Sequence, residues 1–438
     1  MSTKTQELYE RRKRVVPTTL GIFTPTSAAS AQGATIIDAD GRELIDFAGG
    51  IGVLNAGHCP EPVVKAIQDQ AAKLIHTCFP VSIYESYLDL AEKLATLFPH
   101  HAHDGDCTKV MMTNSGAEAV ENAIKIARQA TGRQAILCYL GAFHGRSMMA
   151  MTLTSKTALK LGCGPFAPEV YRLPFPAYNP RIHTASEAEF CQAHLDEIRK
   201  YFTTTVAAQH IAAIIIEPVQ GEGGFYVVPK PYLQGLRQLC DETGILLIID
   251  EVQSGFGRTG KWAAYEHYDI RPDISTWAKS MGSGMPIGCV IAKGSIIDSI
   301  NPGTIGGTYL GNPVCCAAAL ATIQYMEHID INALGVKIGS IIRKRFEEFH
   351  RKYPQHISDV RGLGAMLAFE LSIGGDIAMP DSESCKKLIH FAAEQGLILL
   401  SAGLHSNVIR TLTPLVISEE LLNRGLDIIE AGLKMLAG

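Results

Sequence analysis

Short, nearly continuous runs of aliphatic residues mark the middle of the chain. The two longest, Ile211–Glu217 and Ile245–Asp250, are bounded by turn-forming residues. Runs of this length are typical of strands that are buried on both faces of a parallel sheet. Between them, Tyr232–Thr243 places three leucines on one side of a predicted helix. This region therefore predicts an α/β unit in which strands and helices alternate.

The same alternation begins earlier in the chain. The pattern predicts strands over Lys109–Thr113 and Ala135–Tyr139, with a helix over Glu118–Ala130 between them. Helices that connect successive strands bring those strands together in parallel and cover the sheet. We therefore expect a mainly parallel central sheet with helices on both faces.

The two ends of the chain show a different pattern. Thr35–Phe47 is typical of a hairpin that turns at Asp40-Gly41, and the last quarter of the chain mixes long helices with short strands. These ends predict a second, smaller α+β domain that is built from both termini. The expected boundaries are 1–60 for the N-terminal contribution, 61–325 for the large domain and 326–438 for the C-terminal part of the small domain.

Composition and charge narrow the possible classes of function. The 438 residues carry a formal net charge of -5 with a pI of about 6.3, which gives no sign of a nucleic-acid partner. The apolar runs are much shorter than the roughly 20 residues that span a bilayer. The polar start shows no secretory signal, and the 11 cysteines show neither a CxxC pair nor zinc-site spacing. We expect a cytoplasmic protein with reduced thiols and no membrane partner.

The first candidate site residues join a predicted strand to a predicted helix. In Thr113–Arg128 (TNSGAEAVENAIKIAR), the turn consists of the small residues Asn114, Ser115 and Gly116. Such a turn leaves backbone N–H groups free at the N-terminus of a helix, which favours an anion such as phosphate. The alternative is an ordinary capped helix start.

A second candidate follows the aliphatic run that ends at residue 250. A carboxylate such as Asp250, at the carboxyl end of a parallel strand, faces the ligand crevice of the sheet. A structural ion pair would also explain it. The glycines from Gly255 to Gly260 imitate a GxGxxG nucleotide motif. Because no βαβ unit is expected around them, we reject a nucleotide site.

The third candidate is Lys279, which lies among small residues and precedes Gly282, Gly284 and Pro286. A lysine in apolar, restricted surroundings shifts towards the neutral amine, which is the nucleophilic form that a Schiff base requires. Most lysines in such a pattern would simply lie on the surface. The neighbouring motifs single out Lys279.

Six motifs occur in the order and at the approximate spacing of one enzyme family. They are Thr113–Arg128, Gly141–Ser147 (GAFHGRS), Glu217–Gly224 (EPVQGEGG), Asp250–Gly260 (DEVQSGFGRTG), Ala278–Pro286 (AKSMGSGMP) and Gly306–Pro313 (GGTYLGNP). Together they resemble the class III, or ω-amino acid, aminotransferases, which depend on pyridoxal 5'-phosphate (PLP). The resemblance runs from about Gly33 to the C-terminus and implies PLP fold type I, the fold of aspartate aminotransferase. Three further segments resemble the bacterial members that act on 4-aminobutyrate: Phe47–His58, His76–Tyr87 and Asn407–Leu415.

The resemblance implies a role for each cofactor residue. Lys279 would form the Schiff base with PLP and shuttle a proton, and Asp250 would keep the pyridine nitrogen protonated, which makes the ring a better electron sink. His144 is expected to be structural. The other implied contacts are Ser115, Gly116 and Ala117 to the phosphate, Phe143 and Val252 to the ring faces, Gln253 to the 3'-oxygen, and Thr308 to the phosphate of the neighbouring subunit. The last contact implies a homodimer with a shared active site; a tetramer stays open.

The resemblance also implies a substrate site with two arginines. Arg146 would bind the carboxylate remote from the reacting amine, and Arg410 would bind the α-carboxylate of 2-oxoglutarate or glutamate. Glu222 would pair with Arg410 while an amino donor with a single carboxylate is bound. Ile51 would form an apolar wall. These roles imply transfer of the amino group of 4-aminobutyrate to 2-oxoglutarate, giving succinate semialdehyde and glutamate by a ping-pong mechanism.

Several alternatives stay open. The donor could be another ω-amine, such as 5-aminovalerate, β-alanine or ornithine, because Pro80, Leu310 and Ser283 depart from the family pattern and the first two would narrow the pocket. A racemase or aminomutase, and a non-catalytic protein of the same fold, are the other candidates. The histidines of Pro99–Asp104 could attract a metal, but a polar surface loop explains them and we expect no metal site.

Overall fold

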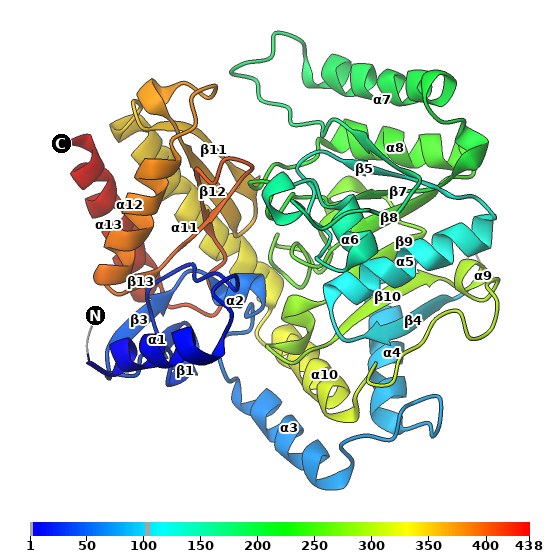
Figure 1. Cartoon of the computed structure of the whole chain (residues 1–438), viewed down its shortest axis with the longest axis horizontal. Helices are drawn as coiled ribbons and strands as arrows, with labels where there is room; N and C mark the ends of the chain where they lie inside the picture. Colours follow the sequence, from blue (N-terminus) through cyan, green and yellow to red (C-terminus); the bar gives the residue numbers. More distant parts are fainter. Residues whose placement is uncertain (1–2, 101–105) are drawn as a thin grey trace.

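The computed structural model describes residues 3–100 and 106–438. Its largest element is a seven-stranded sheet (Figure 1). In spatial order the strands are β4 (Thr108–Thr113), β10 (Gly288–Lys293), β9 (Ile274–Trp277), β8 (Leu246–Asp250), β7 (Ile211–Ile216), β5 (Ala135–Tyr139) and β6 (Val170–Leu173). Every neighbouring pair from β9 to β6 is parallel, and β10 runs antiparallel to both β9 and β4. The mainly parallel central sheet is confirmed.

Three of these strands were not predicted. β9 is short and contains Ser275 and Thr276, β10 begins with a glycine and ends with a lysine, and β6 is a partly exposed edge strand. None of them presents a long aliphatic run in the sequence. The neighbouring strands and helices bury them instead, and apolar periodicity does not reveal that burial. The fully buried β5 and β7, by contrast, were visible as such runs.

Helices cover the central sheet where the sequence pattern places them. α5 (Gly116–Thr131) packs against β7, β9 and β10, and α8 (Lys230–Thr243) packs against β8. Both helices stop at a glycine in the left-handed conformation, Gly132 and Gly244, which has no Cβ to strain. The α/β alternation that was read from the apolar periodicity is therefore confirmed.

The termini meet in a second, four-stranded sheet. Its order is β1 (Ser30–Gln32), β2 (Thr35–Ile37), β3 (Glu43–Asp46) and β13 (Leu397–Ile398). β2 and β3 form the expected hairpin, and β3 pairs in parallel with β13 from the far end of the chain. The third sheet is antiparallel, in the order β11 (Ile357–Leu363), β12 (Met366–Leu371), β15 (Val408–Thr411) and β14 (Leu400–Ala402). Both termini thus contribute to the smaller sheets, while the domain boundaries at residues 60 and 325 stay predictions.

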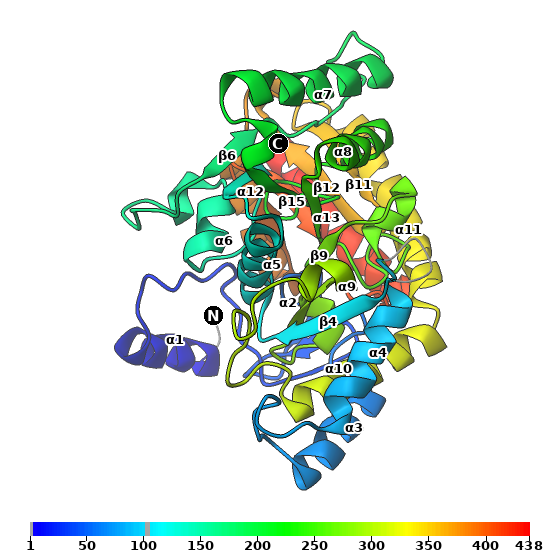
Figure 2. The same ribbon diagram turned by 90° about the vertical axis from the view of Figure 1, so that its right-hand side faces the viewer.

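The remaining helices surround these sheets. α11 (Ile331–Lys352) packs on β11 and β12, and α12 (Ser382–Glu394) packs between β13 and α13 (Glu419–Ala437). At the lower end of both views, α3 (Glu61–Lys73) lies beside α10 (Pro313–His328) (Figure 2). The other helices are α1 (Thr3–Val15), α2 (Gly49–Gly52), α4 (Glu85–Leu97), α6 (Met148–Leu153), α7 (Glu187–Thr204) and α9 (Gly294–Ile297). Within residues 3–100 and 106–438, no helix combines the length and the apolar character that a membrane span needs.

Candidate active site

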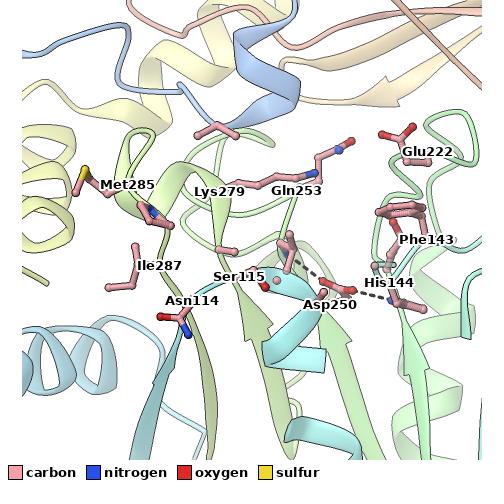
Figure 3. Close-up of a pocket in the computed structure, with 18 of the residues that line it drawn as sticks. Asn114, Ser115, Phe143, His144, Glu222, Asp250, Gln253, Lys279, Met285 and Ile287 are labelled. Atoms are coloured by element: carbon pink, nitrogen blue, oxygen red, sulfur yellow. Dashed lines mark hydrogen bonds and ion pairs between the residues drawn. The ribbon is translucent and has the colours of Figure 1, made fainter. Parts of the chain in front are cut away.

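A cavity of about 350 Å³ opens at the carboxyl ends of the central strands. Its walls come from the segments that follow β4, β5, β7, β8 and β9. This edge of a parallel sheet is where ligands bind in open α/β folds, and the volume falls within the range of small-molecule sites. Figure 3 shows the side chains that converge there.

The start of α5 forms one wall of the cavity. Ser115 is the N-cap, and its Oγ accepts a hydrogen bond of 3.2 Å from the backbone N–H of Glu118. Gly116 and Ala117 follow and also line the cavity. A Cβ on Gly116 would lie 2.9 Å from Cγ1 of Val252, so only glycine permits this close approach. The first N–H groups of the helix have no partner inside it, which gives this wall a positive electrostatic potential.

Asp250 ends β8 and forms a buried pair with His144. Nδ1 of His144 lies 2.7 Å from Oδ2 of Asp250, while Oδ1 accepts a 3.1 Å hydrogen bond from the backbone N–H of Val252 (Figure 3). Burial would lower the pKa of His144, but the hydrogen bond and the charge of Asp250 outweigh it, so the pKa is raised. The histidine therefore tends towards its charged form, and the pair fixes the Asp250 side chain in the cavity wall.

Lys279 extends into the cavity from a strained backbone position. Its φ of 50° is in the left-handed region, which is costly for a residue with a long side chain. Burial lowers the pKa of its ammonium to about 8, against the opposing effect of the Glu222 carboxylate. A substantial fraction of the amine is thus neutral, and therefore nucleophilic, near neutral pH.

Three more of the expected cofactor residues line the same cavity. Phe143 and Val252 come from the segments after β5 and β8, and Gln253 follows Val252 (Figure 3). The Oε1 atom of Gln253 is buried and has no hydrogen-bond partner in the described part of the chain. A buried polar atom without a partner costs free energy, so this atom is suited to meet a polar group of a ligand.

Arg410 and Glu222 form a closed ion pair beside these residues. Arg410 lies in β15 with only 4% of its side chain exposed, and it meets Glu222 in two contacts of 2.5 and 3.2 Å. Burial would raise the pKa of Glu222, but the charge and hydrogen bonds of Arg410 outweigh it, so the pKa is lowered. Both groups are therefore charged, and the pair neutralises each of them.

Glu217 was not singled out from the sequence, and the structure places it in the cavity wall. It follows β7 and is 7% exposed, and burial raises its pKa to about 7. His144 lowers this pKa and Asp250 raises it, so the three groups respond to one another. The only sequence signal was its place in the motif Glu217–Gly224. His144, which was expected to be structural, likewise belongs to the cavity.

Other predicted residues lie outside the cavity wall of this chain. Arg146 is exposed in the loop before α6 and makes no hydrogen bond or ion pair with any described residue. Thr308 is exposed in the loop between α9 and α10. Ile51 adopts a φ of 67° in α2 and packs near Leu44 and Leu400. The three residues are thus not brought together with Lys279 in the single chain.

Two of the departures from the family pattern, Pro80 and Leu310, also lie away from the cavity wall. Pro80 is exposed and Leu310 is buried, and neither lines the cavity. Residues 101–105 of the histidine-rich loop lie outside the described residues. His100 is buried, and its ring contacts the backbone oxygen of Phe98 and Oγ of Ser275. No group of three potential metal ligands occurs among the described residues.

A lysine, a buried aspartate–histidine pair and a helix N-terminus around one cavity of this α/β fold define a PLP enzyme of fold type I. Residues 22–433 match the family model described as aminotransferase class-III. The chain therefore belongs to the class III aminotransferases, which use PLP to move an amino group from a donor to a keto acid.

Comparisons with individual proteins agree with this assignment. The chain is 43% identical over 434 residues to a Bacillus subtilis (strain 168) protein named "Probable 4-aminobutyrate aminotransferase", covering 99% of this chain and 98% of that protein. It is 46% identical over 431 residues to a 5-aminovalerate aminotransferase of Pseudomonas aeruginosa, covering 98% of each. The crystal structure of an amine transaminase from an uncultivated Pseudomonas species, in its PLP-bound form, matches with a TM-score of 0.87 and 28% identity over 96% of each chain.

The cavity of this chain fits PLP on its own features. The amine of Lys279 has a pKa of about 8, Asp250 is buried against His144, and the side-chain amide of Gln253 lies in the wall with its oxygen unpaired among the described residues. The free N–H groups at the start of α5 suit a phosphate. A cationic ring nitrogen, an aldehyde and a phosphate would each find a complementary group, and the phenolic oxygen would accept a hydrogen bond from the amide NH2 of Gln253.

Proposed function

We propose that the protein transfers the amino group of an ω-amino acid to 2-oxoglutarate, and that 4-aminobutyrate is its principal donor. The closed Glu222–Arg410 pair beside Lys279 supports a donor with one carboxylate and an acceptor with two. Among such donors, 4-aminobutyrate is the one named for the 43% identical relative. 4-Aminobutyrate has one carboxylate, whereas 2-oxoglutarate and glutamate have two. A site that takes both kinds of substrate needs one arginine that is always available and a second that can be masked.

Glu222 supplies the mask. With the donor bound, the pair stays closed and Arg410 presents no free charge to an uncharged part of the substrate. With 2-oxoglutarate bound, the α-carboxylate replaces Glu222 on the planar guanidinium, which accepts either carboxylate in the same two-contact geometry. Arg146 is the second arginine in this proposal. Its exposed guanidinium has no partner in the described residues, and it follows Phe143 in the same loop.

The cofactor residues act from the sheet side of the cavity. When bound, PLP supplies the electron sink for the substrate carbanion. Lys279 Nζ holds the cofactor and then carries the proton to and from the reacting carbon. Asp250, paired with His144, would hold a proton on the ring nitrogen. The remaining contacts are assigned to Ser115, Gly116 and Ala117 for the phosphate, Phe143 and Val252 for the ring faces, Gln253 for the phenolic oxygen, and Ile51 for the substrate chain.

We further propose a homodimer in which Thr308 reaches the partner's cofactor phosphate. The segments around residues 75–84 and 307–312 lie side by side, since the amide of Asn312 donates to the backbone oxygen of Ile75 at 2.8 Å. They expose large apolar side chains together: Ile75, Val81, Ile83 and Tyr309. An exposed apolar patch of this kind favours burial against a second copy. Light scattering of the purified protein tests this, with a monomer contradicting it.

A donor panel tests the substrate assignment. Purified enzyme with PLP and 2-oxoglutarate is given 4-aminobutyrate, 5-aminovalerate, β-alanine or ornithine, and the glutamate formed is measured. We expect 4-aminobutyrate to give the highest kcat/KM. The second candidate is 5-aminovalerate, which the 46% identical relative favours. One methylene is worth about 10- to 200-fold in a fitted apolar pocket, so the ratio of the two donors separates the candidates.

A further inference from the structure

Two loops that border the cavity carry the groups that the proposed function assigns to carboxylate binding. The donor loop, residues 140–147, contains Phe143 and Arg146. The gate loop, residues 220–224, contains Glu222. Neither loop belongs to a strand or a regular helix, so its position depends on the contacts that anchor it.

The side chain of Glu217 contacts both loops at once. Its Oε2 atom accepts a 3.0 Å hydrogen bond from the backbone N–H of Phe143, and its Oε1 atom accepts a 3.0 Å hydrogen bond from the backbone N–H of Gly221. Glu217 itself follows directly on β7, in which every residue is buried. One carboxylate thus connects both loops to the rigid centre of the sheet.

The structure assigns Glu217 the role of a positioning residue that fixes the donor loop and the gate loop relative to each other and to the central sheet. The effect on substrate binding rests on the proposed function. There, Arg146 and the Glu222–Arg410 pair are the two carboxylate sites, so the distance between them decides which substrates fit. A carboxylate suits the task because it has two acceptor atoms, and hydrogen bonds to charged acceptors are the stronger ones.

Other side chains also hold the two loops through hydrogen bonds. Unlike Glu217, each of them contacts one loop only or joins one loop to the other. In the donor loop, Oγ1 of Thr154 accepts a 3.0 Å hydrogen bond from the backbone N–H of His144 and donates to the backbone oxygen of Gly145. Behind the gate loop, Nε of Arg361 donates to the backbone oxygen of Gly224 at 2.7 Å. Gln220 joins the loops to each other, because its Nε2 donates to the backbone oxygen of Leu140 at 2.8 Å. Thr154 therefore offers a matched control that affects the donor loop alone.

Glu217→Gln is the decisive variant. An amide has one acceptor oxygen and one NH2 group, so it can accept from one of the two N–H groups and presents a donor to the other. Glutamine has nearly the same size and shape as glutamate, so the variant preserves the packing after β7. If the glutamine variant nevertheless fails to fold, Glu217→Asp replaces it, because its shorter side chain cannot span both loops.

The first measurement is hydrogen–deuterium exchange on the PLP-loaded enzyme without substrate. In Glu217→Gln, the backbone amide of Phe143 or of Gly221 loses its acceptor, so we expect faster exchange in the peptide of the donor loop or of the gate loop. We expect the same in Glu217→Asp. In Thr154→Val we expect faster exchange in the donor loop alone. Unchanged protection of both loops in a folded Glu217 variant would overturn the assignment.

The second measurement is kcat/KM for 4-aminobutyrate and for 2-oxoglutarate. Thr154→Val should lower both by the same factor, because both substrates need Arg146. Glu217→Gln should lower kcat/KM for 2-oxoglutarate about tenfold more than for the donor, the size expected for one hydrogen bond to a charged group. An unchanged ratio of the two values, together with unchanged exchange, contradicts the positioning role. Faster exchange in an enzyme that uses no ω-amino acid supports the positioning role and overturns the proposed function alone.

Discussion

The cofactor side and the substrate side of this active site differ in how many of their assigned side chains lie in the cavity of a single chain. On the cofactor side, Lys279, Asp250 and His144 are buried or partly buried around one cavity, and Asp250 and His144 make a short contact of 2.7 Å. On the substrate side, Arg146 is exposed without a partner in the described residues, and the Glu222–Arg410 pair is closed. The single chain therefore places Lys279, Asp250 and His144 around one cavity. In our proposal, substrate recognition depends on opening of the Glu222–Arg410 pair, and the cofactor phosphate receives Thr308 from a second subunit.

The difference has a physical reason. Groups that bind one permanent ligand gain from rigid preorganisation, because no contact has to be broken during turnover. Groups that bind two substrates in alternation need contacts that can open, as we propose for the Glu222–Arg410 pair. Substitutions on the cofactor side should therefore abolish turnover with every substrate, and substitutions on the substrate side should change the balance between substrates.

The largest effect is expected for Lys279→Ala. Without the amine there is no covalent hold on PLP and no base at the reacting carbon, so kcat should fall by about 10⁴-fold or more. Turnover with 4-aminobutyrate and 2-oxoglutarate measures this. Borohydride reduction followed by peptide mass spectrometry should attach the cofactor to residue 279 in the wild type only. Attachment to another lysine would contradict the assignment.

Asp250→Asn should give the next largest loss. The neutral amide cannot hold a charged ring nitrogen, and the loss of one such electrostatic contact costs about 10²- to 10³-fold in kcat. The matched control is Asp273→Asn, because Asp273 is equally buried but pairs with Arg237 and Lys293 away from the cavity. The control should lower stability and leave kcat nearly unchanged. Equal losses of kcat in the two variants would assign Asp250 a structural role only.

Glu222→Gln should change the balance between substrates rather than the chemistry. Arg410 would stay unmasked, so dicarboxylates would bind more tightly and compete with the donor, and kcat/KM for 4-aminobutyrate should fall by about 10- to 100-fold. Steady-state kinetics with both substrates measures the effect. Glu43→Gln, which removes the exposed pair with Arg424, is the control and should change neither value.

The smallest effect concerns pH. Because the pKa of Lys279 is about 8, the neutral amine increases as the pH rises through 8, and the rate at which apoenzyme captures PLP should rise with it and level off above. The Glu222 carboxylate raises this pKa and Arg410 lowers it. Glu222→Gln should therefore move the midpoint to lower pH. Stopped-flow absorbance measures the midpoint, and a shift to higher pH would show that Glu222 does not act on Lys279.

The sequence predicted the parts of the site that are determined by neighbouring residues in the chain. Asp250 ends an aliphatic strand and Lys279 lies in a motif of small residues, and both occupy the cavity where the parallel strands end. The sequence did not predict β9 and β10, whose burial comes from their neighbours rather than from apolar runs. It also missed Glu217, since a side chain that anchors two loops is recognised only when those loops are placed in space.

The most direct test of the central claim separates the two half-reactions. Wild-type enzyme loaded with PLP is mixed with an excess of 4-aminobutyrate in the absence of any keto acid, and succinate semialdehyde is measured by rapid quench. A parallel sample is freed of unreacted 4-aminobutyrate by gel filtration, 2-oxoglutarate is then added, and glutamate is measured. Our account predicts about one equivalent of each product per subunit, the first without the acceptor and the second only after its addition. No aldehyde before the keto acid is added, with the cofactor held at Lys279, would contradict an amino-group transfer through one site that takes its two substrates in turn.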